Sequence, residues 1–147
     1  MQHQAPPIWV FFYGTIMNPP VLAEFGVTPG SVVPAKLAGF ELSIRPRPNL
    51  ARSERSQVFG SLMSVTHADL TRVYSSLQER FGLEYLPEAV LVETLDGMLK
   101  PALCYVAPHM APGPADQAFV RQLASCARAV GLPDWYASHI ESLAPAD

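Results

Sequence analysis

The sequence predicts an α+β fold, formed by residues 1–147 as a single domain. Short β-branched and aromatic runs dominate the first two thirds of the chain, whereas the clearest long helical pattern comes late. The 15 prolines are spread through the sequence instead of forming a linker, and they interrupt any long helix in the first two thirds. A chain of this length can bury roughly 70% of its unfolded surface in one core.

The first predicted elements are a strand and a short helix. Residues 8–13 are aromatic and β-branched without alternation, as expected of a strand that is buried on both faces. Asn18, followed by Pro19 and Pro20, supplies a helix N-cap and a proline at the first helical position. We therefore expect a short helix over residues 21–24 that ends at Gly26.

The middle of the chain predicts more strands and then a helix. The strands are expected at residues 31–37, 41–44 and 57–65. Gly39 and Gly60 indicate turns, bulges or close backbone approaches in this region. Residues 66–69 resemble a capping box with Asp69 at its fourth position, and they open a helix. Its apolar face carries Leu70, Val73, Tyr74 and Leu77.

The C-terminal part predicts a strand pair and two helices. Residues 89–93 and 102–106 form the strand pair, with a turn around Asp96 and Gly97. An apolar stripe then predicts a helix that ends at Gly131. The stripe consists of Phe119, Leu123, Cys126 and Val130. A last short helix begins at Pro133 and Asp134, with Tyr136, Ile140 and Leu143 on one face.

Composition limits the classes of function. The 10 Lys and Arg residues against 13 Asp and Glu give a net charge of −3, which argues against a large nucleic-acid surface. The longest apolar run, residues 8–13, is far shorter than the ~20 residues that span a bilayer. The N-terminus lacks the pattern of a secretory signal. We expect a cytoplasmic protein in which Cys104 and Cys126 are reduced and buried.

The most informative segment is residues 11–19, where a buried strand ends in glycine and turns at once into a helix start. The backbone N–H groups of Gly14, Thr15 and Ile16 are therefore candidates to point, without partners, into a cavity. Such a group of amides suits a carboxylate or a developing oxyanion. The alternative is an ordinary strand–turn–helix corner whose aromatic residues serve only as core.

Residues 13–17, Tyr-Gly-Thr-Ile-Met, resemble the Tyr-Gly-Ser/Thr-Leu-Met signature of the gamma-glutamylcyclotransferase-like (AIG2-like) family. The similarity continues in order through residues 35–40, 58–62, 65–70, 101–105 and 131–136. The resemblance implies a small mixed β-barrel flanked by helices, with the signature loop at the mouth of a cavity. It also implies that Tyr13, Gly14, Thr15, Ile16 and Tyr105 contact the substrate.

The resemblance implies an enzyme that releases 5-oxoproline from a γ-glutamyl amide or peptide. The substrate's own α-amine attacks its γ-carbonyl, so the protein fixes the conformation, relays protons and holds the oxyanion. The implied partner is an anionic small molecule, and no cofactor or metal is required. The four histidines are scattered without the spacing of a zinc site.

The family's proton-relaying glutamate has no counterpart in the sequence. The two alignments of its Leu-Asp-x-x-Glu-Gly motif place Leu77 or Phe81 at the glutamate position. Glu79 and Glu84 are nearby candidates for a displaced catalytic carboxylate, as is Glu88, although each also fits a solvated surface charge. The alternative function is a non-catalytic domain that binds a small anionic amino-acid derivative.

A second notable segment is residues 45–55, which contain four of the ten basic residues. Its proline and polar content predicts a loop. Arginine side chains suit carboxylate or phosphate groups, so this loop favours an anionic substrate if it borders the cavity. The alternative is a solvated surface loop.

Overall fold

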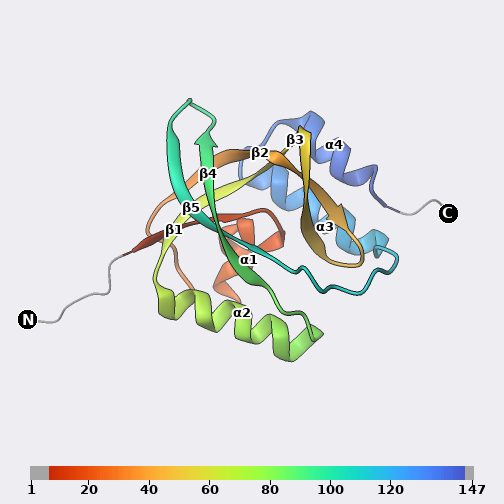
Figure 1. Cartoon of the computed structure of the whole chain (residues 1–147), viewed down its shortest axis with the longest axis horizontal. Helices are drawn as coiled ribbons and strands as arrows, with labels where there is room; N and C mark the ends of the chain where they lie inside the picture. Colours follow the sequence, from red (N-terminus) through yellow and green to blue (C-terminus); the bar gives the residue numbers. More distant parts are fainter. Residues whose placement is uncertain (1–6, 145–147) are drawn as a thin grey trace, which may run out of the picture.

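The computed structural model describes residues 7–144, in which five strands close into a barrel (Figure 1). The strands are β1 (Ile8–Phe12), β2 (Val32–Ile44), β3 (Pro48–Val65), β4 (Leu86–Thr94) and β5 (Leu99–Val106). Their order around the barrel is β1-β3-β2-β4-β5. The pairing of β1 with β5 is parallel and the other pairings are antiparallel. The predicted α+β class and mixed barrel are confirmed.

Within residues 7–144, five helical segments accompany the barrel. They are η1 (Thr15–Met17), α1 (Pro19–Ala23), α2 (His67–Phe81), α3 (Gln117–Ala129) and α4 (Asp134–Glu141). In Figure 1, α2 lies below the barrel, whereas α3 and α4 lie together at the right-hand side. The short η1 and α1 segments follow directly after β1 and carry the chain away from the barrel.

The barrel interior is aromatic and aliphatic, as the unalternating first strand predicted. Val10 and Phe11 are fully buried and Phe12 is 1% exposed. Because β1 is hydrogen-bonded to β3 on one side and β5 on the other, its backbone is paired along both edges. This places the end of β1, and the loop that follows it, against a rigid core.

Two glycines shape the long strands. The predicted strands 31–37 and 41–44 are one strand, β2, because Gly39 (φ +88°) absorbs a change of register between Ala38 and Phe40. A Cβ atom at Gly60 would lie 2.2 Å from the carbonyl oxygen of Phe12. Only glycine allows β3 and the end of β1 to approach this closely, so the expected bulge and close approach are both confirmed.

The prediction of a loop over residues 45–55 is wrong. Only residues 45–47 form the turn, and β3 begins at Pro48 and pairs with β2. Phe40, Leu42 and Ile44 on β2 are buried, so the apolar face of this hairpin outweighs the polar content of its second strand. Pro48 is tolerated because the first residue of a strand does not need to donate a ladder hydrogen bond.

Helix α2 begins as predicted. The Thr66 side chain accepts a hydrogen bond from the N–H of Asp69, and the Asp69 carboxylate accepts one from the N–H of Thr66. The helix ends at Gly82 in the left-handed conformation (φ +66°). Its two ends are therefore fixed by local sequence, which sets the position of its last turn beside the barrel.

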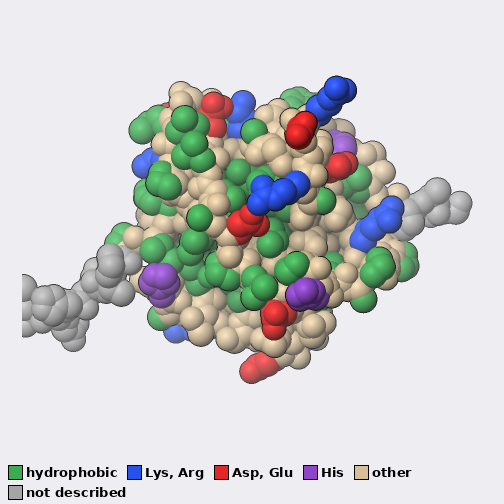
Figure 2. Space-filling model, in the orientation of Figure 1, with side chains coloured by type: hydrophobic (Ala, Val, Ile, Leu, Met, Phe, Trp, Pro, Cys, Tyr) green, Lys and Arg blue, Asp and Glu red, His purple; other side chains and the backbone are tan. Residues whose placement is uncertain are grey.

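The hairpin of β4 and β5 extends from the barrel at the side opposite α2 (Figure 1). Figure 2 shows hydrophobic side chains over this hairpin, and its exposed apolar residues include Leu91, Leu95, Met98 and Leu99.

Within residues 7–144, no helix has both the length and the apolar character to cross a membrane.

Candidate functional site

A cavity of about 460 Å³ opens beside the loop that follows β1. Its wall combines that loop with α1, the β2–β3 turn, the last turns of α2, β5 and α3. The wall residues are Phe12, Tyr13, Gly14, Thr15, Ile16, Val21, Glu24, Phe25, Arg47, Pro48, Tyr74, Leu77, Arg80, Phe81, Leu83, Tyr85, Tyr105, Phe119 and Gln122. This volume lies in the range of small-molecule sites.

The loop of residues 13–16 lines this cavity and carries main-chain N–H groups without acceptors among residues 7–144. Among residues 7–144, no acceptor takes a hydrogen bond from the N–H groups of Gly14, Thr15 or Ile16, and all three residues line the cavity. The carbonyl oxygen of Gly14, in contrast, accepts a hydrogen bond from the N–H of Met17 at 2.9 Å. The free amides can therefore receive an anion without breaking an internal bond.

The position of this loop is fixed from both ends. Ser61 on β3 is fully buried and its hydroxyl donates to the carbonyl oxygen of Met17 at 2.9 Å. Tyr13 is 5% exposed, and its hydroxyl donates to the carbonyl oxygen of Tyr105 at 2.6 Å. These contacts tie the loop to two strands of the barrel, so the direction of its amides does not depend on a bound ligand.

Among residues 7–144, four tyrosines line the cavity. They are Tyr13 from the loop, Tyr74 from α2, Tyr85 from the segment before β4 and Tyr105 from β5. The rings of Tyr74 and Tyr105 stack with centroids 3.9 Å apart, and the Tyr85 ring lies 5.8 Å from that of Tyr74. The Tyr85 hydroxyl donates to the Pro48 carbonyl oxygen at 2.7 Å. Burial raises the pKa of Tyr13 and of Tyr74 well above the usual value. These hydroxyls remain neutral and serve as hydrogen-bonding groups.

Cys104 lies behind this tyrosine cluster on β5. Burial, with a smaller contribution from the charge of Glu88, raises the pKa of its thiol to about 12. The thiol is therefore protonated at neutral pH and is a poor nucleophile. Cys104 and Cys126 are both free and buried, which confirms that they are core residues.

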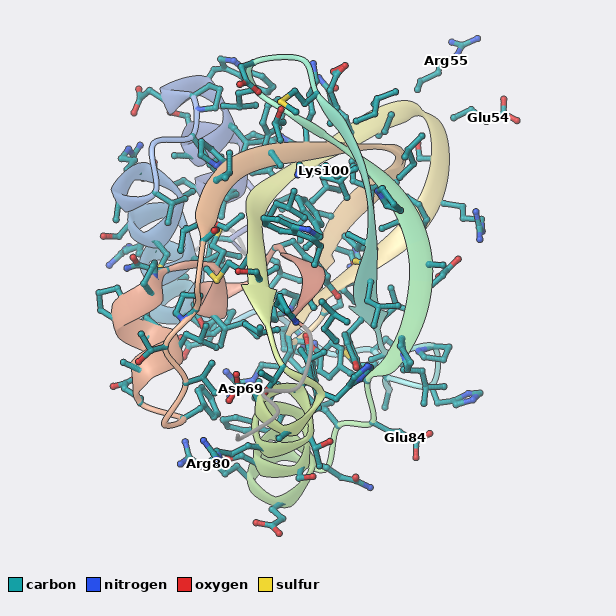
Figure 3. The ribbon with its side chains drawn as sticks, turned by 90° about the vertical axis from the view of Figure 1, so that its left-hand side faces the viewer. Glu54, Arg55, Asp69, Arg80, Glu84 and Lys100 are labelled. Atoms are coloured by element: carbon teal, nitrogen blue, oxygen red, sulfur yellow. The ribbon has the colours of Figure 1, made fainter. Side chains whose placement is uncertain are left out.

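The charged residues of the cavity wall are two arginines and one glutamate. Arg47 comes from the β2–β3 turn, Arg80 from α2 and Glu24 from the end of α1. In Figure 3, Arg80 lies on the side of α2 toward α1. Two positive groups against one negative group favour an anionic ligand, in a chain whose net charge is −3.

The structure separates the predicted site residues into two groups. Tyr13, Gly14, Thr15, Ile16 and Tyr105 all line the cavity. The two displaced carboxylates proposed from the sequence are instead exposed and absent from its wall.

Those two carboxylates are Glu79 and Glu84. Figure 3 shows the Glu84 side chain pointing outward from the segment after α2. Leu77 and Phe81, which the alignments place at the family's glutamate position, both line the cavity. The third nearby acid, Glu88, forms an ion pair with Arg52 at 2.5 Å.

Sequence reasoning did not select Glu24, Arg80 or Tyr85 as site residues. The signal for Glu24 was its place just after the signature loop, in the short helix that this loop begins. No local pattern distinguishes Arg80 or Tyr85 from other residues near the end of α2. No group of three or more His, Cys, Asp or Glu side chains within residues 7–144 is arranged to hold a metal ion.

Comparisons with known proteins agree with this architecture. A solved gamma-glutamyl cyclotransferase is 17% identical, with a TM-score of 0.79 over 96% of this chain and 90% of that chain. An uncharacterized protein from Homo sapiens is 16% identical, with a TM-score of 0.81 over 97% and 90%. At these identities the likeness shows the fold.

A more distant solved structure is a gamma-glutamyl cyclotransferase from yeast, described as specific to glutathione. It is 13% identical, with a TM-score of 0.60 over 94% of this chain and 95% of that chain. No curated protein matches the sequence significantly. The family model for gamma-glutamyl cyclotransferase, AIG2-like, matches residues 10–124. The chain therefore belongs to the gamma-glutamyl cyclotransferase, AIG2-like family.

Proposed function

We propose that the cavity binds a γ-glutamyl amide or peptide and releases 5-oxoproline from it by intramolecular attack. The observation that carries this proposal is that the free amides of residues 14–16 share one cavity with a carboxylate, Glu24. Membership of the family supports the γ-glutamyl group as the ligand. Such a reaction needs a fixed conformation, a proton acceptor and an oxyanion site.

In this reaction, the α-amine nitrogen of the ligand attacks the γ-carbonyl carbon and forms the ring C–N bond. The carbonyl oxygen becomes an oxyanion, and in this proposal the N–H groups of the cavity-lining residues Gly14, Thr15 and Ile16 stabilise it. The bond to the leaving nitrogen then breaks. The proton lost by the attacking amine is delivered to the leaving amine, so no oxidant, reductant or metal enters the balance.

Glu24 is our candidate for the group that carries this proton. Within residues 7–144 it is the one carboxylate in the cavity wall, and it lies at the C-terminus of α1, the short helix that follows the signature loop. A carboxylate accepts the proton that the attacking amine loses and passes it to the leaving nitrogen without a cofactor. Its position on α1 differs from the α2 position that the family pattern predicts.

Binding without turnover is the second candidate function. The specific observation in its favour is that Leu77 and Phe81 occupy both aligned positions for the family's glutamate, and neither side chain transfers protons. The Glu24 side chain is also solvent-exposed. In this case the same amides and arginines hold an anionic amino-acid derivative that is not consumed.

The test is to incubate the protein with a series of γ-glutamyl peptides and γ-glutamyl amines and to measure 5-oxoproline. Glu24→Gln, Glu79→Gln and Glu84→Gln are compared, since each removes one candidate carboxylate. The proposal is supported if the rate of 5-oxoproline release falls by about 100-fold or more in Glu24→Gln and is unchanged in the other two variants. Loss in Glu79→Gln or Glu84→Gln instead assigns the proton relay to that residue.

Ligand binding is measured in parallel by thermal unfolding. A ligand at 100 times its dissociation constant stabilises the folded state by about 2.7 kcal/mol. Stabilisation without 5-oxoproline supports the second candidate function. Neither stabilisation nor product with any γ-glutamyl compound contradicts both.

A further inference from the structure

We infer that Arg47, in the wall of the cavity that also contains residues 14–16, selects ligands that carry a second acid group. The inference rests on the proposed function, because it concerns the same cavity. Sequence patterns pointed only to a basic segment, and most of that segment lies in β3 outside the cavity. Arg47, in the β2–β3 turn, is the one of the segment's four arginines that lines the cavity.

The guanidinium group of Arg47 is held between two aromatic rings. Its Cζ atom lies 4.2 Å from the centroid of the Phe81 ring and 4.9 Å from that of the Phe119 ring. These rings come from the end of α2 and from α3, and both line the cavity. Contact with ring faces orients a guanidinium while leaving its N–H groups available to an acceptor.

Those N–H groups have no acceptor in the described part of the chain. Arg47 has neither an ion pair nor a side-chain hydrogen bond there. Arg52 differs, because it also contacts an aromatic ring, that of Phe40, but donates to Glu88. Arg47 is half-buried, so a positive charge is positioned and partly desolvated without a partner. A carboxylate from a ligand would supply one.

Arg47 also lies close enough to the free amides for one small ligand to reach both. A Cβ atom at Gly14 would lie 3.5 Å from Cγ of Pro48, the residue that follows Arg47. Burial raises the pKa of Tyr85 to about 12, and the charge of Arg47 opposes this rise. The arginine therefore acts on the same tyrosine cluster that borders the loop.

Two probes that differ in one carboxylate test the inference directly. γ-Glutamylalanine and γ-glutamylethylamide share the γ-glutamyl group and the two-carbon amine, and only the first has an acid group on that amine. Binding is measured by calorimetry, or as kcat/KM for any probe that is turned over. We expect wild-type protein to prefer γ-glutamylalanine by about tenfold or more, as for a charge-assisted hydrogen bond.

In Arg47→Gln, we expect this preference to fall to within about twofold. Arg52→Gln is the matched control, because it removes an arginine that contacts an aromatic ring in the same hairpin but lies outside the cavity. It should keep the wild-type preference. A second variant, Phe119→Leu, keeps Arg47 and removes one of its rings, and should reduce the preference by about threefold. This variant tests the inference even if Arg47→Gln does not fold.

The outcomes separate the inference from the proposed function. Equal binding of both probes by the wild-type protein, or an unchanged preference in Arg47→Gln and Phe119→Leu, overturns the role of Arg47 and leaves the γ-glutamyl site standing. Failure of the wild-type protein to bind either probe overturns both. A preference lost in Arg47→Gln and kept in Arg52→Gln supports the inference.

Discussion

The cavity has two walls that differ in the chemical groups that line it. The loop wall, residues 13–16, offers main-chain N–H groups, whereas the wall formed by the end of α2 offers the side chains of Leu77 and Phe81. The loop wall keeps the family's signature, and the α2 wall is apolar where that family pattern has an acid. Anion binding by backbone depends on fold geometry, and proton transfer depends on individual side chains, so one can be kept while the other changes.

The two walls also differ in how firmly they are held. The loop is tied to the barrel through the hydrogen bonds of Tyr13 and Ser61, and the last three residues of the strand before it, Val10–Phe12, are buried. Phe81, in contrast, is 44% exposed at the end of its helix. Substitutions in the α2 wall should therefore cost less stability than changes that move the loop.

The largest expected effect is at Gly60, which allows the loop wall to form. In Gly60→Ala, the added Cβ would lie 2.2 Å from the Phe12 carbonyl oxygen and 3.0 Å from Phe11 Cζ. Backbone must move to relieve this overlap, so we expect a loss of roughly 3 kcal/mol or more in the free energy of unfolding. Urea denaturation followed by circular dichroism measures it.

Gly113→Ala is the control, because the nearest heavy atom to its added Cβ is 3.9 Å away. We expect it to change the free energy of unfolding by less than about 0.5 kcal/mol. Equal stability of Gly60→Ala and the wild-type protein would contradict the close approach of β1 and β3.

The next effect concerns the thiol of Cys104, which is buried on β5. The folded state raises the pKa of Cys104 from 9.0 to about 12, so the folded protein keeps a proton that the unfolded chain loses. The stabilisation is complete below pH 9 and decreases as the pH rises through about 12. One such group changes the free energy of unfolding by about 1.4 kcal/mol per pH unit.

Cys104→Ala should therefore reduce the loss of stability that begins as the pH rises above 9, where the thiol of the unfolded chain starts to ionise. Cys126→Ala is the matched comparison, because burial also raises the pKa of that thiol, against an opposing hydrogen bond from Asn18. Denaturation curves across this pH range measure both. A stability that rises with pH above 9 would contradict the burial of these groups.

A smaller effect is expected from the hydroxyl that ties the loop wall to β5. Tyr13→Phe removes the hydrogen bond to the Tyr105 carbonyl oxygen and should cost about 1–2 kcal/mol. Tyr85→Phe removes the corresponding bond to Pro48 from a less buried ring and should cost less. Thermal denaturation of both variants makes the comparison. The reverse ranking would show that the loop is not the firmer wall.

The smallest expected effect on stability is at Gly14. Its φ of −97° is open to any L-residue, and an added Cβ would make only ordinary contacts with Pro48. We expect Gly14→Ala to change the free energy of unfolding by less than about 1 kcal/mol. Because Gly14 lines the cavity, the methyl group should still weaken ligand binding. A large loss of stability would show that the loop depends on glycine for its fold.

Local sequence was sufficient for the elements that have local causes. The capping box at Thr66 and the unalternating run before Tyr13 each identified an element that the structure contains. Closure of the barrel was predicted through the family resemblance, because it pairs β1 with β5 across more than 90 residues. Such long-range pairing leaves no signal in neighbouring residues.

The contrast between local and long-range causes also explains which residues of the candidate site could be predicted from the sequence. The loop amides were predicted because a strand, a glycine and a helix start are adjacent in sequence. Glu24 and Arg80 join the cavity through tertiary packing of α1 and α2, which spacing alone does not encode. The loop predicted over residues 45–55 was wrong because pairing with the buried residues of β2 outweighed local polarity.

We propose that the amides of residues 14–16 bind an acid group or oxyanion in the cavity. Amide chemical shifts of ¹⁵N-labelled protein, followed by NMR during titration with γ-glutamylalanine, test it most directly. We predict saturable shifts that are largest at Gly14, Thr15 and Ile16, together with slower hydrogen exchange at these three positions. Shifts confined to other surfaces, with these amides unchanged at saturation, would contradict the claim.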